Sequence, residues 1–110
     1  MPVVKLPLPP STNNSYGLRG KTRYMYSEAR LWKTASMWTF KKFRGSEPTT
    51  LTIRYYLKFN RDVDGSHKLI LDAMQERGEG AGVMKDDKTI TELHLFKYKD
   101  KENPRVEVEW

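Results

Sequence analysis

The sequence predicts a small α/β (α+β) domain, in which two helices pack on one face of a small mixed β-sheet. Three observations lead to this prediction. Residues 51–59 alternate between apolar and polar side chains, as a half-buried strand does. Two segments with helical spacing of apolar residues flank that stretch, near 27–44 and 66–77. Further strand-like segments lie at both ends, and the resulting order β-α-β-α-β-β is typical of helices that cover a sheet.

The chain begins with a short strand and a turn. Val3 to Leu8 is expected to form a strand, which Pro7 restricts to an edge or an end. After a proline-rich turn, residues 16–23 form a glycine loop. Its cations are Arg19, Lys21 and Arg23. Such a loop can follow a phosphate backbone, because glycine permits close approach and the cations neutralise charge. A mobile, solvated connection is equally compatible with these residues.

The first helix is expected to begin at the N-cap Ser27 and to end before the turn at 45–48. Its residues Leu31, Ala35 and Trp38 recur at helical spacing on one face, and Trp32 and Met37 broaden the apolar surface. We therefore expect this face to be buried in the core.

The central strand and the second helix have the clearest patterns. The strand at 51–59 is expected to point its odd-numbered apolar residues inward: Leu51, Ile53, Tyr55, Leu57 and Phe59. The second helix, at about 66–77, is expected to bury one apolar face: Leu69, Ile70, Ala73 and Met74. Glycines at 78–82 then end the helix. Two more strands are predicted at 90–98 and 106–110, separated by a turn at Asn103-Pro104.

Composition limits the function classes. The chain of 110 residues fits a single domain spanning 1–110, and it has no cysteine for disulfides, zinc thiolates or a cysteine nucleophile. No apolar run is long enough to cross a bilayer, so we expect an intracellular, cytoplasmic protein without a membrane partner. A net charge of +6 suits a polyanion, most simply nucleic acid. A generally basic surface that only maintains solubility is the alternative.

Carboxylates gather in one stretch of this basic chain. Asp62 and Asp64 follow the central strand, and two apart on an extended segment they point to one side. Lys68 and Asp72 continue at spacings of four, as one polar stripe on a helix. Hard divalent cations such as Mg²⁺ bind carboxylate oxygens together with substrate phosphate. The stretch therefore suggests metal-assisted phosphodiester chemistry.

The acidic stretch has two other interpretations. Asp-x-Asp-Gly also forms a turn and a helix N-cap, in which Asp64 accepts from first-turn amides. This alternative stays open. A calcium loop of the EF-hand type requires glycine at its sixth position and glutamate at its twelfth. Counted from Asp62, Gly65 is fourth and position twelve is Ala73, which excludes that loop.

Several segments, in the same order, resemble the RusA family of Holliday-junction resolvases from phages and prophages. The resemblance covers nearly the whole chain. The matching segments are Leu6-Pro7-Leu8-Pro9-Pro10-Ser11-Thr12-Asn13, Gly20-Lys21-Thr22-Arg23, Ser27-Glu28-Ala29, Asp62-x-Asp64-x-x-x-Lys68-x-x-x-Asp72-Ala73, and Ala81-Gly82-Val83 followed by Asp86-Asp87. Two departures stand out. The family's asparagine after the second acid is Gly65 here, and the stretch 75–82 is a few residues longer than usual.

The resemblance implies a homodimer that resolves four-way DNA junctions with Mg²⁺ or Mn²⁺. It places the essential acids at Asp62, Asp64 and Asp87 and the catalytic lysine at Lys68. Asp86 matches a further acidic position, so we expect the metal ligands to come from these four aspartates. Lys68 would offset negative charge on the transition state.

The remaining expectations concern DNA and the competing function classes. Besides the loop cations, Arg61 and Lys85 are expected to bind junction arms, with an affinity that falls steeply as salt rises. His67 is interpreted as a surface histidine rather than a general base. A binding module whose acids only cap a helix, or a degenerate resolvase that binds junctions without cutting them, is the main alternative. A phage structural protein would not require the acids.

Overall fold

The computed structural model describes residues 2–10, 16–19, 22–25, 27–61, 63, 65–77 and 79–110, with only the backbone at 16–19 and 22–25. In chain order the elements are β1 (Val3–Leu6), β2 (Tyr16–Arg19), β3 (Thr22–Met25), α1 (Ser27–Phe40), η2 (Lys41–Phe43), β4 (Thr50–Leu57), α2 (His67–Met74), η3 (Asp87–Thr89), β5 (Glu92–Lys99) and β6 (Arg105–Glu109). The elements η2 and η3 are short 3₁₀ helices.

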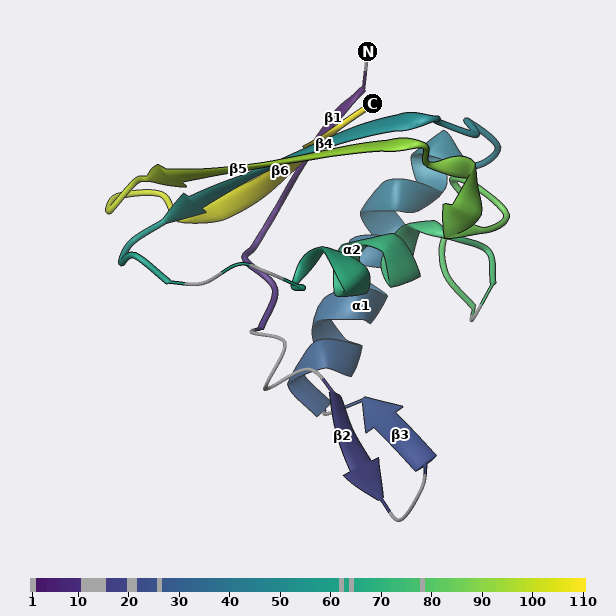
Figure 1. Ribbon diagram of the computed structural model, residues 1–110, viewed down its shortest axis with the longest axis horizontal. Coiled ribbons are helices and arrows are strands. Elements are labelled where there is room, and N and C mark those ends of the chain that lie inside the picture. The colour runs from purple at the N-terminus through teal and green to yellow at the C-terminus, as the bar shows by residue number, and fades with distance from the viewer. Residues whose placement is uncertain are drawn as a thin grey trace.

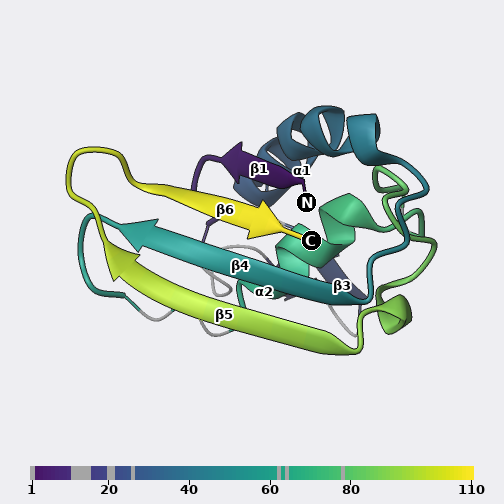
Figure 2. The same ribbon diagram turned by 90° about the horizontal axis from the view of Figure 1, so that it is seen from above.

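A mixed four-stranded sheet organises the fold, in the order β1-β6-β4-β5 (Figure 2). β4 runs parallel to β5, and β6 is antiparallel to both β4 and β1. Both α helices lie on the same face of this sheet, and no helix of the described residues covers the opposite face (Figure 1). The predicted fold class, a mixed sheet with two helices on one face, is confirmed.

The core lies between the sheet and the helices. The inward residues of β4 are Leu51, Ile53, Tyr55 and Leu57, and those of α2 are Leu69, Ile70, Ala73 and Met74, all of them buried as predicted. Phe59 is the exception, because β4 ends at Leu57 and the Phe59 side chain is 71 % exposed. Its expected place in the strand was wrong.

The buried face of α1 also differs from the prediction. Leu31 and Trp38 are 73 % and 67 % exposed, and Ala35 is exposed too. The face turned to the core consists of Ala29, Trp32, Ser36 and Phe40, so of the expected residues Trp32 is buried as predicted. Trp32 fixes this rotation, because its indole N–H donates to the backbone oxygen of Pro7 at 2.8 Å. Burial of Trp32 therefore leaves its indole N–H with a hydrogen-bond partner, as buried polar atoms require.

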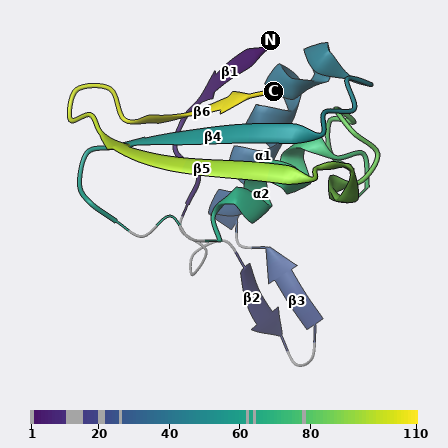
Figure 3. The ribbon, with the colours of Figure 1, turned by 45° about the horizontal axis from the view of Figure 1, so that its top comes forward.

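Two further segments differ from expectation. Within residues 16–23, expected to form a glycine loop, the described backbone belongs to the strands β2 and β3, which pair as an antiparallel hairpin that projects away from the sheet and helices (Figure 3). The helix α2 ends at Met74 rather than near residue 77, because Gln75 is extended and pairs with Met84 in a parallel bridge. No helix in the described part of the chain is long and apolar enough to cross a membrane.

Candidate functional site

The segment between β4 and α2 is fixed at both of its ends. At one end, the Arg61 guanidinium donates to the backbone oxygen of Pro9 at 3.0 Å. At the other, the Ser66 hydroxyl is hydrogen-bonded to the buried Tyr55 hydroxyl at 2.8 Å and to the oxygen of Val63 at 2.7 Å. The predicted site residues Asp62 and Asp64 fall inside this segment in the sequence and lie outside the described residues.

Gly65 has a backbone conformation that suits its residue type. Its φ angle is +83°, in the left-handed region that glycine adopts without steric cost. Asparagine is among the few other residues that tolerate this region. The glycine at position 65 therefore allows this turn without backbone strain. Ser66, at the N-cap of α2, makes no side-chain cap hydrogen bond. The cap role considered for Asp64 concerns a residue outside the described ones.

Two acidic segments contribute to the site: the first contains Asp62 and Asp64, and the second contains Asp86 and Asp87. Gln75 connects the end of α2 to the second acidic segment. Its amide nitrogen donates to the carboxylate of Asp72 at 3.3 Å, and its amide oxygen accepts from the backbone N–H of Asp87 at 3.0 Å. Backbone hydrogen bonds also link the residues after α2 to the segment before Asp86. Glu76 N–H donates to Met84 O at 2.8 Å, and Arg77 N–H donates to Lys85 O at 3.2 Å. The carboxyl end of α2 therefore holds Asp87 in place.

Asp86 is already paired within the fold. It caps η3 by accepting from the backbone N–H of Lys88 at 3.0 Å, and it receives a hydrogen bond from Arg77 at 3.3 Å. The bond from Lys88, together with those from Asp87 and Arg77, lowers the pKa of Asp86. This carboxylate is thus ionised and fixed, and it contributes a permanent negative charge beside Asp87.

The pKa of Asp87 shifts in the opposite direction. Partial desolvation raises its pKa, and the hydrogen bond and charge of Asp86 and the charge of Asp72 raise it further. The neighbouring Asp86 and Asp72 therefore disfavour ionisation of Asp87, and a divalent cation relieves such repulsion with the oxygen ligands that Mg²⁺ prefers. The donor set fits a hard cation, although the described residues alone form no group of three or more ligands positioned around one ion.

Comparison with known protein families matches residues 7–109 to the family described as Endodeoxyribonuclease RusA. The chain belongs to the RusA family. No curated protein matches the sequence. RusA proteins are endodeoxyribonucleases that act on junction DNA, which agrees with the net charge of +6 and with an acidic cluster in a basic chain. The matched range includes both acidic segments, and the resemblance that the motifs indicated is confirmed.

In this RusA chain, the candidate residues lie before, on and after α2 in the sequence. Asp62 and Asp64 precede its amino end in the sequence, Lys68 and Asp72 lie one turn apart on it, and Asp87 is tied to its carboxyl end. Eight residues of helix span about 12 Å. Lys68 is exposed and Asp72 half-buried, so this side of α2 is accessible to a substrate backbone.

The expected DNA-binding residues are distributed over three regions. Arg19 ends β2 and Arg23 lies in β3, whereas Lys21 is outside the described residues. Lys85 is exposed beside Asp86. The guanidinium of Arg61 is half-buried against Pro9 and also positions the acidic segment. Gln75 is the site residue that the sequence patterns did not reveal.

Proposed function

We propose that this RusA chain resolves four-way DNA junctions by paired symmetric phosphodiester cleavage, acting as a homodimer with Mg²⁺ or, alternatively, Mn²⁺. The observation that carries the proposal is the grouping of carboxylates at the carboxyl end of α2, where Gln75 is hydrogen-bonded to both Asp72 and the backbone N–H of Asp87, in a chain of net charge +6 that matches the RusA family over residues 7–109. Grouped carboxylates whose charges oppose one another are a mark of sites that bind a cation.

The four aspartates of the two acidic segments would hold the metal: Asp62, Asp64, Asp86 and Asp87. When bound, a divalent ion lowers the pKa of a coordinated water and stabilises the leaving oxygen of a phosphodiester. Gln75 keeps Asp87 in position through the backbone hydrogen bond at 3.0 Å. Arg77 balances part of the Asp86 charge, which leaves Asp87 the less committed carboxylate.

Lys68 supports the reaction from the neighbouring turn of α2. Its exposed ammonium group lies on the helix between the two acidic segments in the sequence. A cation at this place offsets the charge that accumulates on the phosphoryl oxygens in the transition state. The expected consequence of Lys68→Met is a large loss of turnover with little loss of junction binding, because one ammonium group contributes a small part of the total phosphate neutralisation.

The homodimer follows from the symmetry of the substrate. A four-way junction has two-fold symmetry, so two symmetric cuts require two copies of one active site. Each copy would present the hairpin cations Arg19, Lys21 and Arg23, together with Arg61 and Lys85, to the junction arms. A light-scattering mass of two chains in the junction complex is the expected result, and a mass of one chain would contradict paired cleavage by a dimer.

The experiment compares cleavage of a synthetic four-way junction with cleavage of a matched linear duplex in Mg²⁺. The wild type is expected to cut only the junction, at symmetric positions, and Asp64→Asn and Asp87→Asn are expected to abolish cutting while junction binding persists. Glu79→Gln is the matched control, because Glu79 is exposed and its side chain makes no hydrogen bond or ion pair within the described residues. Junction binding by the wild type without cleavage in Mg²⁺ or Mn²⁺ would leave a junction-binding module.

A further inference from the structure

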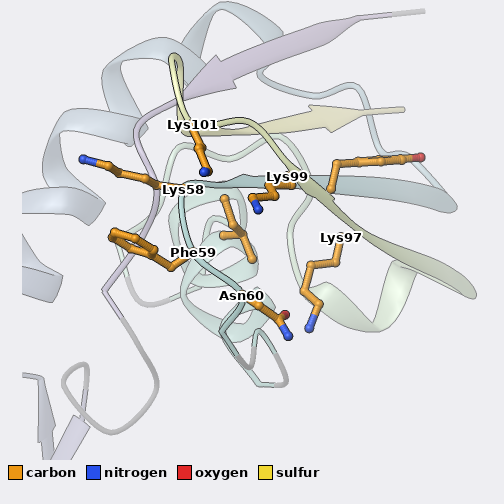
Figure 4. Close-up of a pocket in the computed structure, with 8 residues that line it drawn as sticks. Lys58, Phe59, Asn60, Lys97, Lys99 and Lys101 are labelled. Atoms are coloured by element: carbon orange, nitrogen blue, oxygen red, sulfur yellow. The ribbon is translucent and has the colours of Figure 1, made fainter.

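A pocket of about 440 Å³ opens at the carboxyl ends of the parallel strands β4 and β5. Residues 57–60, 97–99 and 101 line it, and we call it the lysine pocket. Its four lysines are Lys58, Lys97, Lys99 and Lys101, and no acidic residue is among the described residues that line it. Figure 4 shows these lysines around the pocket, with Phe59 and Asn60 from the segment after β4.

The register of the sheet explains why lysines surround a partly apolar pocket. Lys97 pairs with Tyr55 and Lys99 with Leu57, so both lysines occupy the side of β5 that faces the core elsewhere. The carboxyl ends of the two strands extend past α2, so no helix covers this end of the sheet (Figure 1). Leu57, 2 % exposed, supplies apolar surface, and the lysines supply positive charge where the cover ends.

The positive charge of the lysine pocket is not balanced within the described part of the chain. None of its lysines belongs to an ion pair there. The nearest acid in the sequence, Asp100, is engaged by Arg105 at 2.9 Å and by the backbone N–H of Asn103 at 3.0 Å. Clustered like charges with no counter-charge attract a polyanion and raise its local concentration.

Phe59 adds an exposed aromatic ring to this charge. Its side chain is 71 % exposed, and the Lys58 ammonium lies 5.6 Å from the ring centroid. An exposed phenylalanine beside several lysines is the combination that binds nucleic-acid strands, in which cations neutralise phosphates and the ring stacks on a base.

The lysine pocket adjoins the first acidic segment. Lys97 donates from its ammonium group to the backbone oxygen of Arg61 at 3.2 Å, and Arg61 precedes Asp62 in the chain. A DNA strand that reaches the acidic segment therefore passes close to these lysines. We propose that the lysine pocket binds phosphates of that strand, and that Phe59 stacks on a base left unpaired at the branch point. This inference rests on the proposed junction substrate.

The test measures junction and linear-duplex binding by fluorescence anisotropy in EDTA over a range of salt concentrations. Lys99→Gln/Lys101→Gln is expected to reduce the salt slope, by about 0.7–0.9 for each phosphate that is no longer neutralised. The control is Lys41→Gln/Lys42→Gln, an exposed pair just after α1 with the same change in net charge. A slope equal to that of the wild type in the first variant would overturn the phosphate assignment.

Phe59→Ala separates stacking from charge. It is expected to weaken junction binding by about fivefold to a hundredfold, the range for one base that no longer stacks, and to leave duplex binding unchanged. Phe59→Trp should retain the wild-type affinity, and unchanged urea midpoints would show that both variants fold. Equal junction affinity for wild type and Phe59→Ala would overturn the stacking role.

If the wild type cuts junctions while the pocket variants match it, only the pocket assignment fails. If the wild type binds no junction, the proposed function fails with it.

Discussion

Gln75 offers the sharpest test of how the second acidic segment is held. Replacing it with methionine keeps the length of the side chain and removes both polar atoms. The backbone N–H of Asp87 then loses its acceptor, the Gln75 amide oxygen at 3.0 Å. Asp72 also loses the hydrogen bond that it accepts from the Gln75 amide nitrogen at 3.3 Å. Leaving a partly buried donor unsatisfied costs about 1–3 kcal/mol. We therefore expect Gln75→Met to lower the free energy of unfolding by about that amount.

The assay is urea unfolding at pH 7, paired with isothermal titration of Mn²⁺. The variant is expected to bind Mn²⁺ more weakly than the wild type, because Asp87 is no longer held beside Asp86. Gln75→Glu is the informative companion, since it keeps an acceptor for Asp87 N–H and places a carboxylate against Asp72. Its loss of stability should diminish as the pH falls and the added carboxyl group becomes protonated. A Gln75→Met protein with unchanged unfolding free energy and unchanged Mn²⁺ affinity would refute the positioning role.

Two further predictions concern the same region. Gly80→Ala should destabilise the protein strongly in urea unfolding, because an added Cβ would lie 1.9 Å from the Gln75 backbone oxygen and 2.6 Å from that of Asp72. Gly45→Ala, where nothing lies within 4 Å but φ is +81°, should cost only about 1 kcal/mol, and an equal loss in both variants would contradict the argument. Asp87→Asn should stabilise the metal-free protein at pH 7. The pKa of Asp87 is raised in the folded state, so the wild type loses stability as the pH rises and Asp87 ionises, whereas asparagine does not ionise. The difference should vanish below about pH 4, and a difference that persists there would show another cause.

The sequence predicted the fold correctly in the elements that have a single apolar face, which is the face turned to the core. In β4, burial alternates residue by residue, and in α2 one apolar stripe faces the sheet, so periodicity alone identifies the core. The sequence of α1 carries two apolar stripes, and the choice between them depends on the bond from Trp32 to Pro7, 25 residues away. The glycines at 17 and 20 suggested a loop, although the backbone on either side pairs as a hairpin.

The acidic residues of the site could be predicted from the sequence, but the residue that holds Asp87 in position could not. Spacing and family resemblance identify carboxylates, because their number and order are visible in the sequence. The role of Gln75 depends on a hydrogen bond with Asp87, 12 residues away, across a loop that no periodicity describes. The lysine pocket was equally hidden, because strand alternation assigned Phe59 to the core and gave no sign that the helices leave the end of β5 uncovered.

The most direct test of the proposed metal site is anomalous diffraction from crystals of the full chain soaked in Mn²⁺. We expect one or two ions at bonding distance from carboxylate oxygens of Asp87 and of Asp62 or Asp64, and the disappearance of this density in Asp87→Asn. Ions bound elsewhere, or no ion beside Asp87 while the soaked crystals stay ordered, would contradict the claim that the two acidic segments form one metal site.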